Sequence, residues 1–188
     1  MTDTQAIAIR PEQQVAVALA DHTKRDLLRH TLASSLDDTE FELFCEVAAA
    51  KGLDPFSGQI HALKRGGKNP KMSIQVGIDG LRLVAIRTGD YAGQEGPYWC
   101  GDDGTWRDVW LSKEPPAAAK VGVIRRGFER PLFAVATFGE YAQYTSFDGK
   151  RQLNSMWQSK GALMLAKCAE AMALRKAFPA ECSGLYSD

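Results

Sequence analysis

Apolar residues recur at helical spacing in three stretches of the first half of the chain. Residues 23–32 begin with a threonine that is able to cap a helix, and leucines follow at helical spacing. Residues 37–53 show the i, i+3, i+4 pattern more strongly and run into Gly52, a residue typical of helix ends. Residues 79–89 open with an aspartate and close with Gly89. The pattern therefore predicts a helix in each stretch.

Strand-like runs come in pairs rather than singly. Residues 59–77 hold two short runs around GGKNP, and residues 120–138 hold two β-branched and aromatic runs around GFER, so both predict hairpins. Residues 91–119 predict strand fragments and exposed turns, residues 139–144 a helical turn, and residues 145–155 a polar loop. Helices alternating with hairpins predict an α+β fold with antiparallel hairpins packed against helices, rather than a doubly wound α/β fold.

The last predicted helix, SMWQSKGALMLAKCAEAMALRKAF over residues 155–178, carries cations on one side. At ~100° per residue, Lys160, Lys167 and Arg175 fall within an arc of roughly 80° and follow one another at ~11–12 Å along the axis, with Ala171 between them. The opposite arc holds the small residues Ala162, Ala166, Ala169 and Ala173. The basic side is able to follow a sugar-phosphate backbone and line a DNA groove, and the alternative is an ordinary solvated face.

Two further basic groups favour the DNA interpretation. Lys150 and Arg151 come shortly before the last helix, and the turn of the first hairpin carries four cations around two glycines that let backbone N–H groups approach an anion. Trp157 could stack on a base or pack beneath the preceding loop, and packing is the favoured alternative. The candidate DNA-binding residues are Arg175, Lys167, Lys160, Lys150, Arg151, Lys64, Arg65, Lys68, Lys71 and Trp157.

Length and charge narrow the class of protein. The 188 residues suit one domain, which we expect over residues 23–188 after a flexible arm at residues 1–22. Lys plus Arg and Asp plus Glu are 23 each, which argues against indiscriminate coating of nucleic acid but not against a local basic groove. Residues 150–176 hold six basic residues and one acid. Without an apolar run of ~18 residues or an apolar leader, we expect a cytoplasmic protein without membrane contact.

Most catalytic motifs are missing from the sequence. KRGGKNPK has Ala62 and Asn69 where a phosphate loop needs Gly and Ser or Thr, and neither G-x-S-x-G nor H-E-x-x-H is present. The four cysteines are far apart and form no zinc pattern with the three histidines. Five acids could in principle gather around magnesium as in a nuclease, namely Asp79, Asp90, Glu95, Asp102 and Asp103. We predict no catalytic residue, no metal site and no cofactor.

Three blocks of the sequence resemble one known family. They are GLDPFSGQIHA, VGIDGLRL with RTGDYAG, and MWQSKGALMLAKCAEAMALRKAFP followed by GLY. Over about residues 24–187 the chain resembles the phage recombination proteins of the RecT/Bet (lambda Red-beta) single-strand annealing family, because the blocks occur in the family's order with its spacing.

The resemblance implies a protein that binds single-stranded DNA and pairs it with a complementary strand without ATP, in the cytoplasm of a bacterial host. It implies a homo-oligomer, as a ring or helical filament, that works beside a phage 5′-to-3′ exonuclease. Arg175 matches a family arginine that contacts the DNA backbone, and Lys160 and Lys167 lie in the matching helix. Family members usually continue into a C-terminal partner-binding segment, which we expect to be absent here.

Three alternatives remain open. The protein could coat single strands without annealing them, cut DNA with metal held by Asp79 and neighbouring acids, or serve as a protein scaffold without a DNA role. An annealing protein speeds pairing of complementary oligonucleotides and a coat protein slows it. Magnesium-dependent cleavage would favour the nuclease, and a gel shift would exclude the scaffold.

Overall fold

The computed structural model of the protein describes residues 11–65, 70–147 and 149–184. The chain divides into two compact units, unit 1 with Met1–Gly80 and Gly184–Asp188, and unit 2 with Leu81–Ser183. Helices combine with antiparallel strand pairs throughout the described residues, so the predicted α+β class is confirmed. The single domain expected over residues 23–188 stays a prediction.

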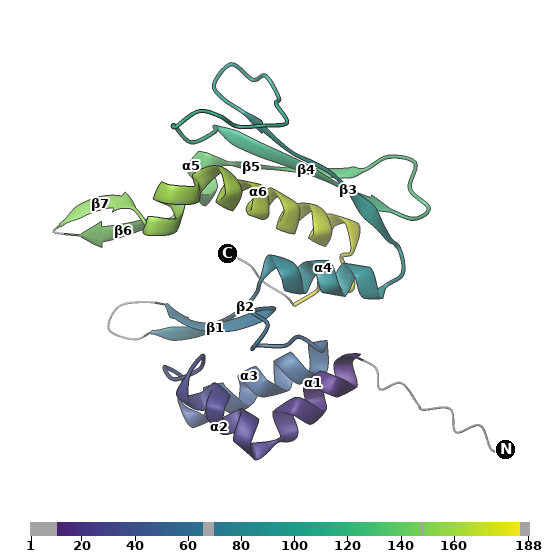
Figure 1. Ribbon diagram of the computed structural model, residues 1–188, viewed down its shortest axis with the longest axis vertical. Helices are drawn as coiled ribbons and strands as arrows, with labels where there is room; N and C mark the ends of the chain where they lie inside the picture. The colour runs from purple at the N-terminus through teal and green to yellow at the C-terminus, as the bar shows by residue number, and fades with distance from the viewer. Residues whose placement is uncertain (1–10, 66–69, 148, 185–188) are drawn as a thin grey trace. The chain divides into compact units, whose positions relative to one another are not determined.

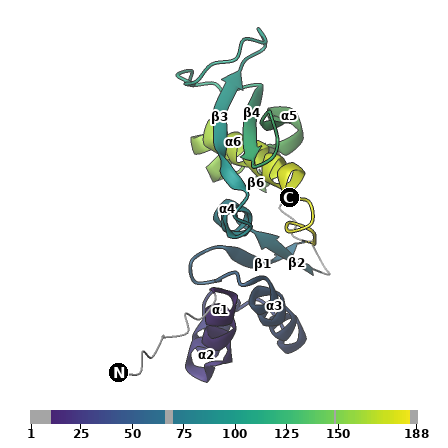
Figure 2. The same ribbon diagram turned by 90° about the vertical axis from the view of Figure 1, so that its right-hand side faces the viewer.

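Unit 1 combines helices with one hairpin in its described part (Figure 1). In chain order its elements are α1 (Pro11–Ala20), α2 (His22–His30), α3 (Asp38–Lys51), β1 (Ile60–Arg65) and β2 (Lys71–Val76), and α4 (Ile78–Arg87) begins in this unit and continues into unit 2. Helix α1 packs against α2 and α3, and Figure 2 shows the three helices grouped at one end of the unit. The helices predicted over residues 23–32, 37–53 and 79–89 are therefore confirmed.

Residues 11–20 form helix α1, whereas the sequence pattern predicted a flexible arm over residues 1–22. The prediction is wrong for this stretch because α1 packs against α2 and α3, with Leu19 buried at only 4% exposed. Such a short helix is stabilised by packing rather than by its own propensity. Residues 1–10 lie outside the described residues.

The ends of α3 follow directly from its sequence. Asp37 accepts a hydrogen bond from the backbone N of Glu40 at 2.9 Å, and the Glu40 carboxylate accepts one from the backbone N of Asp37 at 2.8 Å, which forms a capping box. Gly52 ends the helix in the left-handed conformation at φ 59°. Phe44 and Ala48 of the same helix are buried in the core.

The predicted first hairpin is confirmed as β1 paired with β2, in register from Ile60 opposite Val76 to Arg65 opposite Lys71. Helix α4 starts immediately after this hairpin and approaches it closely at Gly80. A Cβ atom added to Gly80 would lie 2.3 Å from the carbonyl oxygen of Gln59, so only glycine fits this contact.

Unit 2 is a three-stranded sheet with α6 packed against it (Figure 1, Figure 2). After the end of α4, its elements are β3 (Tyr91–Cys100), β4 (Ala118–Arg125), β5 (Leu132–Thr137), α5 (Phe138–Tyr141), β6 (Tyr144–Phe147), β7 (Lys150–Leu153) and α6 (Ser155–Ala177). The sheet order is β3–β4–β5, and β6 pairs with β7 as a separate hairpin. The second predicted hairpin is confirmed as β4 and β5.

Small and β-branched residues let α6 lie close to the sheet. Val121 and Val123 of β4 are buried, and so are Ala169 and Ala173 on the alanine side of α6. Packing of these side chains removes apolar area from water, which stabilises the unit by about 25 cal/mol per Å² buried. The packing role predicted for the alanine arc is thus confirmed.

Two segments form longer strands than the sequence pattern predicted, which was strand fragments in one and a polar loop in the other. Residues 91–100 form one long strand, β3, whose register shifts between Tyr91 and Gly93 and again between Glu95 and Tyr98. These irregularities accommodate the glycines and the proline that obscured the strand in the sequence. Residues 144–153 form the β6–β7 hairpin instead of a polar loop, with Gly149 at φ 70° in its turn.

Across the residues that the structure describes, every helix is too short or too polar to span a lipid bilayer.

Candidate nucleic-acid interface

Helix α6 is kinked at Lys160, where the backbone leaves helical geometry (φ −137°, ψ 34°). Three features explain the kink. The hydroxyl of Ser159 donates to the carbonyl oxygen of Ser155 at 2.7 Å, a bond that tends to bend helices. Gly161 follows, and a Cβ there would lie 3.2 Å from the Phe138 ring. The indole Nε1 of Trp99 donates to the carbonyl oxygen of Ala162 at 2.9 Å, which holds the second segment in place.

The kink changes the predicted row of cations, because a helical wheel assumes one continuous helix. Lys160 and Lys167 are exposed, whereas Arg175 is only partly exposed and its Nη2 is buried. Ala171, expected between the cations on the open side, is buried as well. The three cations therefore do not share one open stripe. Because they are more exposed, Lys160 and Lys167 are better candidates than Arg175 for contacts to a DNA backbone.

Glu170, the one acid of this helix, is neutralised within unit 2. Its two carboxylate oxygens accept hydrogen bonds from Nε and Nη2 of Arg82 at 2.6 and 2.7 Å. Glu170 is 5% exposed, so its charge lies beneath the surface and is paired by a bidentate guanidinium. Tyr91 lies in the same environment, where burial, followed by the charge of Glu170, raises the pKa of its hydroxyl. The exposed charge of α6 is consequently positive.

Lys150 and Arg151 lie on β7, directly before α6, and both are exposed. The Arg151 guanidinium lies 4.1 Å from the centroid of the Tyr144 ring on β6, a cation–π contact that fixes its position. Asn154 joins this hairpin to the helix, because its side chain caps α6 by accepting from the backbone N of Trp157 at 2.9 Å. The β6–β7 hairpin leads into the first turn of α6 (Figure 1), and its second strand carries the two cations.

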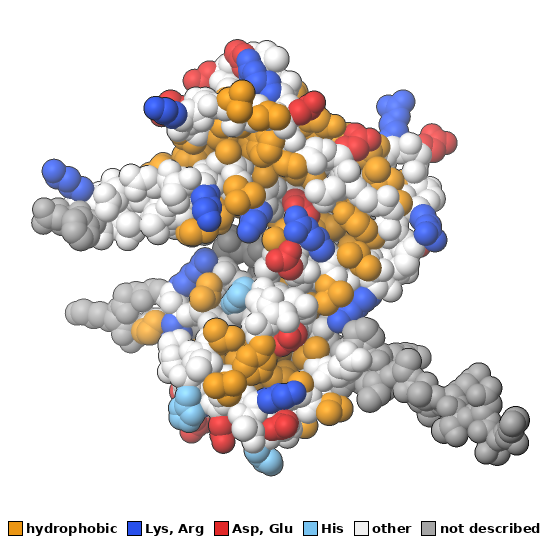
Figure 3. Space-filling model, in the orientation of Figure 1, with side chains coloured by type: hydrophobic (Ala, Val, Ile, Leu, Met, Phe, Trp, Pro, Cys, Tyr) orange, Lys and Arg blue, Asp and Glu red, His pale blue; other side chains and the backbone are white. Residues whose placement is uncertain are grey.

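Basic side chains recur across the surface that α6 forms on the face shown in Figure 3, with hydrophobic side chains between them. The described residues that place exposed positive charge on α6 and β7 are Lys150, Arg151, Lys160, Lys167 and Lys176. Lys176 differs from the others because its Nζ already donates a hydrogen bond within the protein, to the carbonyl oxygen of Phe133 at 3.0 Å. We call Lys150, Arg151, Lys160 and Lys167 the α6 basic cluster.

Trp157 is buried, at 2% exposed, and its ring meets Phe138 edge-on with centroids 5.6 Å apart. Trp157 also lines a cavity beside the kink of α6. The packing alternative is therefore confirmed, and a DNA contact by Trp157 stays a prediction.

The basic residues of the first hairpin, in unit 1, have different environments. Lys64 is half-buried and its Nζ lies 2.7 Å from the Glu40 carboxylate, so part of its charge is neutralised within the unit. Arg65 and Lys71 are exposed and opposite each other at the end of the described hairpin. Lys68 lies outside the described residues. For this hairpin, a DNA contact stays a prediction.

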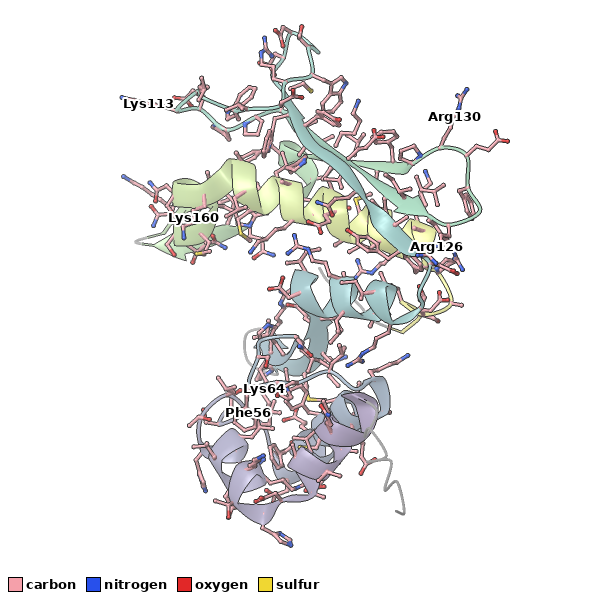
Figure 4. All side chains as sticks on the ribbon, turned by 45° about the vertical axis from the view of Figure 1, so that its right-hand side comes forward. Phe56, Lys64, Lys113, Arg126, Arg130 and Lys160 are labelled. Carbon is pink, nitrogen blue, oxygen red and sulfur yellow. The ribbon has the colours of Figure 1, made fainter. Side chains whose placement is uncertain are left out.

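A cavity of about 480 Å³ opens beside the kink of α6, and the sequence pattern did not reveal it. Lys160 lines it from the helix, and Trp110 and Lys113 line it from the segment before β4. Figure 4 shows Lys113 and Lys160 on the same side of unit 2. Residues 106–115, which include two tryptophans, gave the one hint of this cavity in the sequence. A helical wheel shows neither the kink of α6 nor which distant segment lies beside it.

The acids weighed for a metal site are dispersed or paired. Asp103 receives two hydrogen bonds from Arg107, which, with a backbone bond from Thr105, hold the pKa of its carboxyl down at about 2. Asp90 lies 3.5 Å from the Arg125 guanidinium. Among the residues that the structure describes, His, Cys, Asp and Glu form no group of three or more able to hold a metal ion.

The four cysteines are free thiols without a disulfide. Burial raises the pKa of Cys168 to about 11 and is also the main cause of the raised pKa of Cys45. A raised pKa keeps these thiols protonated and unreactive near neutral pH.

No curated protein sequence matches the chain. The family model described as the RecT family matches residues 18–188, nearly the whole chain. Proteins of that family bind single-stranded DNA and anneal it in recombination, and they are generally not catalytic. The chain belongs to the RecT family.

Proposed function

We propose that this protein anneals complementary DNA strands without ATP and holds each strand through its phosphates. The observation that carries the proposal is the α6 basic cluster, where Lys160 and Lys167 are exposed on one helix and Lys150 and Arg151 lie on the adjoining hairpin. Fixed cations lower the repulsion between two polyanions and release their counterions. Contacts confined to phosphates leave the base edges free, so that base pairing itself selects the partner strand.

Family membership, rather than this surface, supports a wider setting for the proposal. We propose that copies of the chain assemble on DNA as a ring or helical filament, in a bacterial cytoplasm during phage recombination. A 5′-to-3′ exonuclease would supply the single strand on which they assemble. Repeated subunits along one strand would make binding cooperative and sensitive to salt.

The test is the rate of duplex formation between two complementary labelled oligonucleotides, without ATP. The natural protein should shorten the time of pairing relative to the free strands. The double variant Lys160→Ala with Lys167→Ala should bind single strands about tenfold or more weakly, because two charge-assisted contacts are lost, and should anneal correspondingly slowly. Lys176→Ala is the matched control, since it removes one positive charge from the same helix outside the cluster.

Three outcomes would contradict the proposal. Pairing that is slower with the protein than without it would identify a coat protein. Equal loss in the control and the double variant would show that charge anywhere on α6 suffices. A folded double variant that binds and anneals like the natural protein would remove the phosphate role of Lys160 and Lys167.

A further inference from the structure

We propose that the cavity at the kink of α6 captures one unpaired nucleobase of the bound strand, stacked on Trp110. This inference rests on the proposed function and adds a subsite for a base to a surface that otherwise contacts phosphates. The cavity volume of about 480 Å³ lies within the range of ~300–1,000 Å³ typical of small-ligand sites.

The indole of Trp110 is held in a fixed position at the wall of this cavity. Its Nε1 donates to the carbonyl oxygen of Glu114 at 2.8 Å, so the polar edge of the ring is satisfied within the protein. The opposite edge lies beside Gly101, where an added Cβ would come within 3.3 Å of the ring. The ring is half-buried, and with these two edges engaged we expect it to present a π-face to the cavity, on which every nucleobase is able to stack.

The charges around the cavity suit a nucleotide. Lys113 and Lys160 are exposed on its lining, against one carboxylate, Glu114, so the site is positive on balance. Ser112 and Ser159 add hydroxyls to the same lining. A base inside the cavity would leave its flanking phosphates near the two lysines, and Lys160 already belongs to the α6 basic cluster.

A neighbouring cavity shows by contrast why this one is favoured. Trp110 also lines a cavity of about 530 Å³ whose charged residues are Asp102, Asp103 and Arg107. Arg107 is held by Asp103 through two hydrogen bonds, so this second lining is acidic on balance and repels phosphate. The strand is therefore expected on the side of Trp110 that bears Lys113 and Lys160.

The experiment is photochemical cross-linking of the full chain to single-stranded oligonucleotides that carry 5-iodouracil, followed by trypsin digestion and mass spectrometry. The expected adduct lies in the peptide of residues 108–113, in which Trp110 is the one tryptophan. Trp106, which is exposed but lines neither cavity, falls in the separate peptide 88–107 and serves as the internal control. A strand paired to its complement should give no adduct at Trp110, because its bases are engaged.

Affinity measurements separate base capture from phosphate binding. Trp110→Leu should weaken binding of oligothymidine about tenfold, Trp110→Phe should restore most of it, and neither should affect binding of an abasic strand that has only sugar and phosphate. Lys113→Ala should weaken binding of the oligothymidine and of the abasic strand equally. Thermal melting of each variant shows whether it has folded. Because Lys113 is exposed, its replacement by alanine tests the cavity without changing the core.

The outcomes also distinguish this inference from the proposed function. Binding and annealing without an adduct in peptide 108–113, or an equal loss for the abasic strand in Trp110→Leu, would overturn base capture and leave annealing intact. A natural protein that fails to bind single strands at all would overturn both.

Discussion

At the scale of single residues, Arg82 and Glu170 form an ion pair in which the carboxylate is buried. Glu170 is the one charged side chain buried among the described residues, while the Arg82 side chain is 40% exposed. Removing one partner of a buried pair leaves an uncompensated charge, and the cost depends on which partner is left in the interior.

We therefore predict that Arg82→Ala lowers the free energy of unfolding by about 2–3 kcal/mol, because it leaves Glu170 charged and buried. Glu170→Ala should cost less, since Arg82 is able to reach water. The double change to Met at both positions should recover part of the loss, as apolar residues of similar volume often replace buried pairs well. Urea unfolding of the three variants measures these differences, and equal losses for the two single variants would contradict the assignment.

The sequence predicted the exposure of individual side chains on α6 only in part, because it does not show which of them other elements cover. The exposure of Lys160 and Lys167 followed from helical spacing, but the same spacing placed Arg175 and Ala171 on the open side, where the structure buries them in part or fully. A wheel assigns directions around one helix and contains no information on what else packs against it. The burial of Trp157 was the favoured alternative because large aromatic rings usually pack in cores.

At the scale of elements, the junction between β2 and α4 depends on glycine. Glycine to alanine within a helix normally stabilises a protein by about 0.5–1 kcal/mol. At Gly80 the new Cβ would lie 2.3 Å from a backbone oxygen and 2.7 Å from the Val76 side chain, and the backbone cannot move aside cheaply. The steric cost should exceed the gain in helix propensity.

We predict that Gly80→Ala lowers the melting temperature and destabilises the protein by about 1–3 kcal/mol. Gly139→Ala is the matched control, because Gly139 also lies in a helix, α5, and an added Cβ would meet nothing within 4 Å. The control should melt at or slightly above the natural temperature. If both variants were equally stable, the close approach of α4 to residue 59 would be refuted.

Elements were predictable where their signals are local. The capping box of α3, its Gly52 end and the two longer hairpins are encoded by neighbouring residues. The kink of α6 was missed because it depends on Trp99 and Phe138, which are distant in sequence. Strand β3 was predicted only as strand fragments because bulges hide its alternation. The β6–β7 hairpin was missed because its short strands are mostly polar and exposed.

At the scale of the whole molecule, charge is unevenly distributed although the formal net charge is zero. Phosphate binding depends on the field near the strand, so the α6 basic cluster acts independently of acids elsewhere in the chain. Each phosphate contact on a single strand contributes about −0.7 to the slope of log affinity against log salt concentration.

We predict a slope of about −3 for binding of a short oligothymidine, from the four cations of the α6 basic cluster. Lys167→Ala should reduce the magnitude of the slope by about 0.7. Lys176→Ala should leave the slope unchanged, because the Lys176 ammonium lies outside the cluster and is hydrogen-bonded to the Phe133 carbonyl oxygen. Fluorescence anisotropy between about 50 and 200 mM salt gives both slopes. The reduction should be the same for oligothymidine and oligocytidine, because the lost contact is to phosphate. A reduction seen with one base alone would mean that Lys167 reads base edges, which an annealing protein must leave free for pairing.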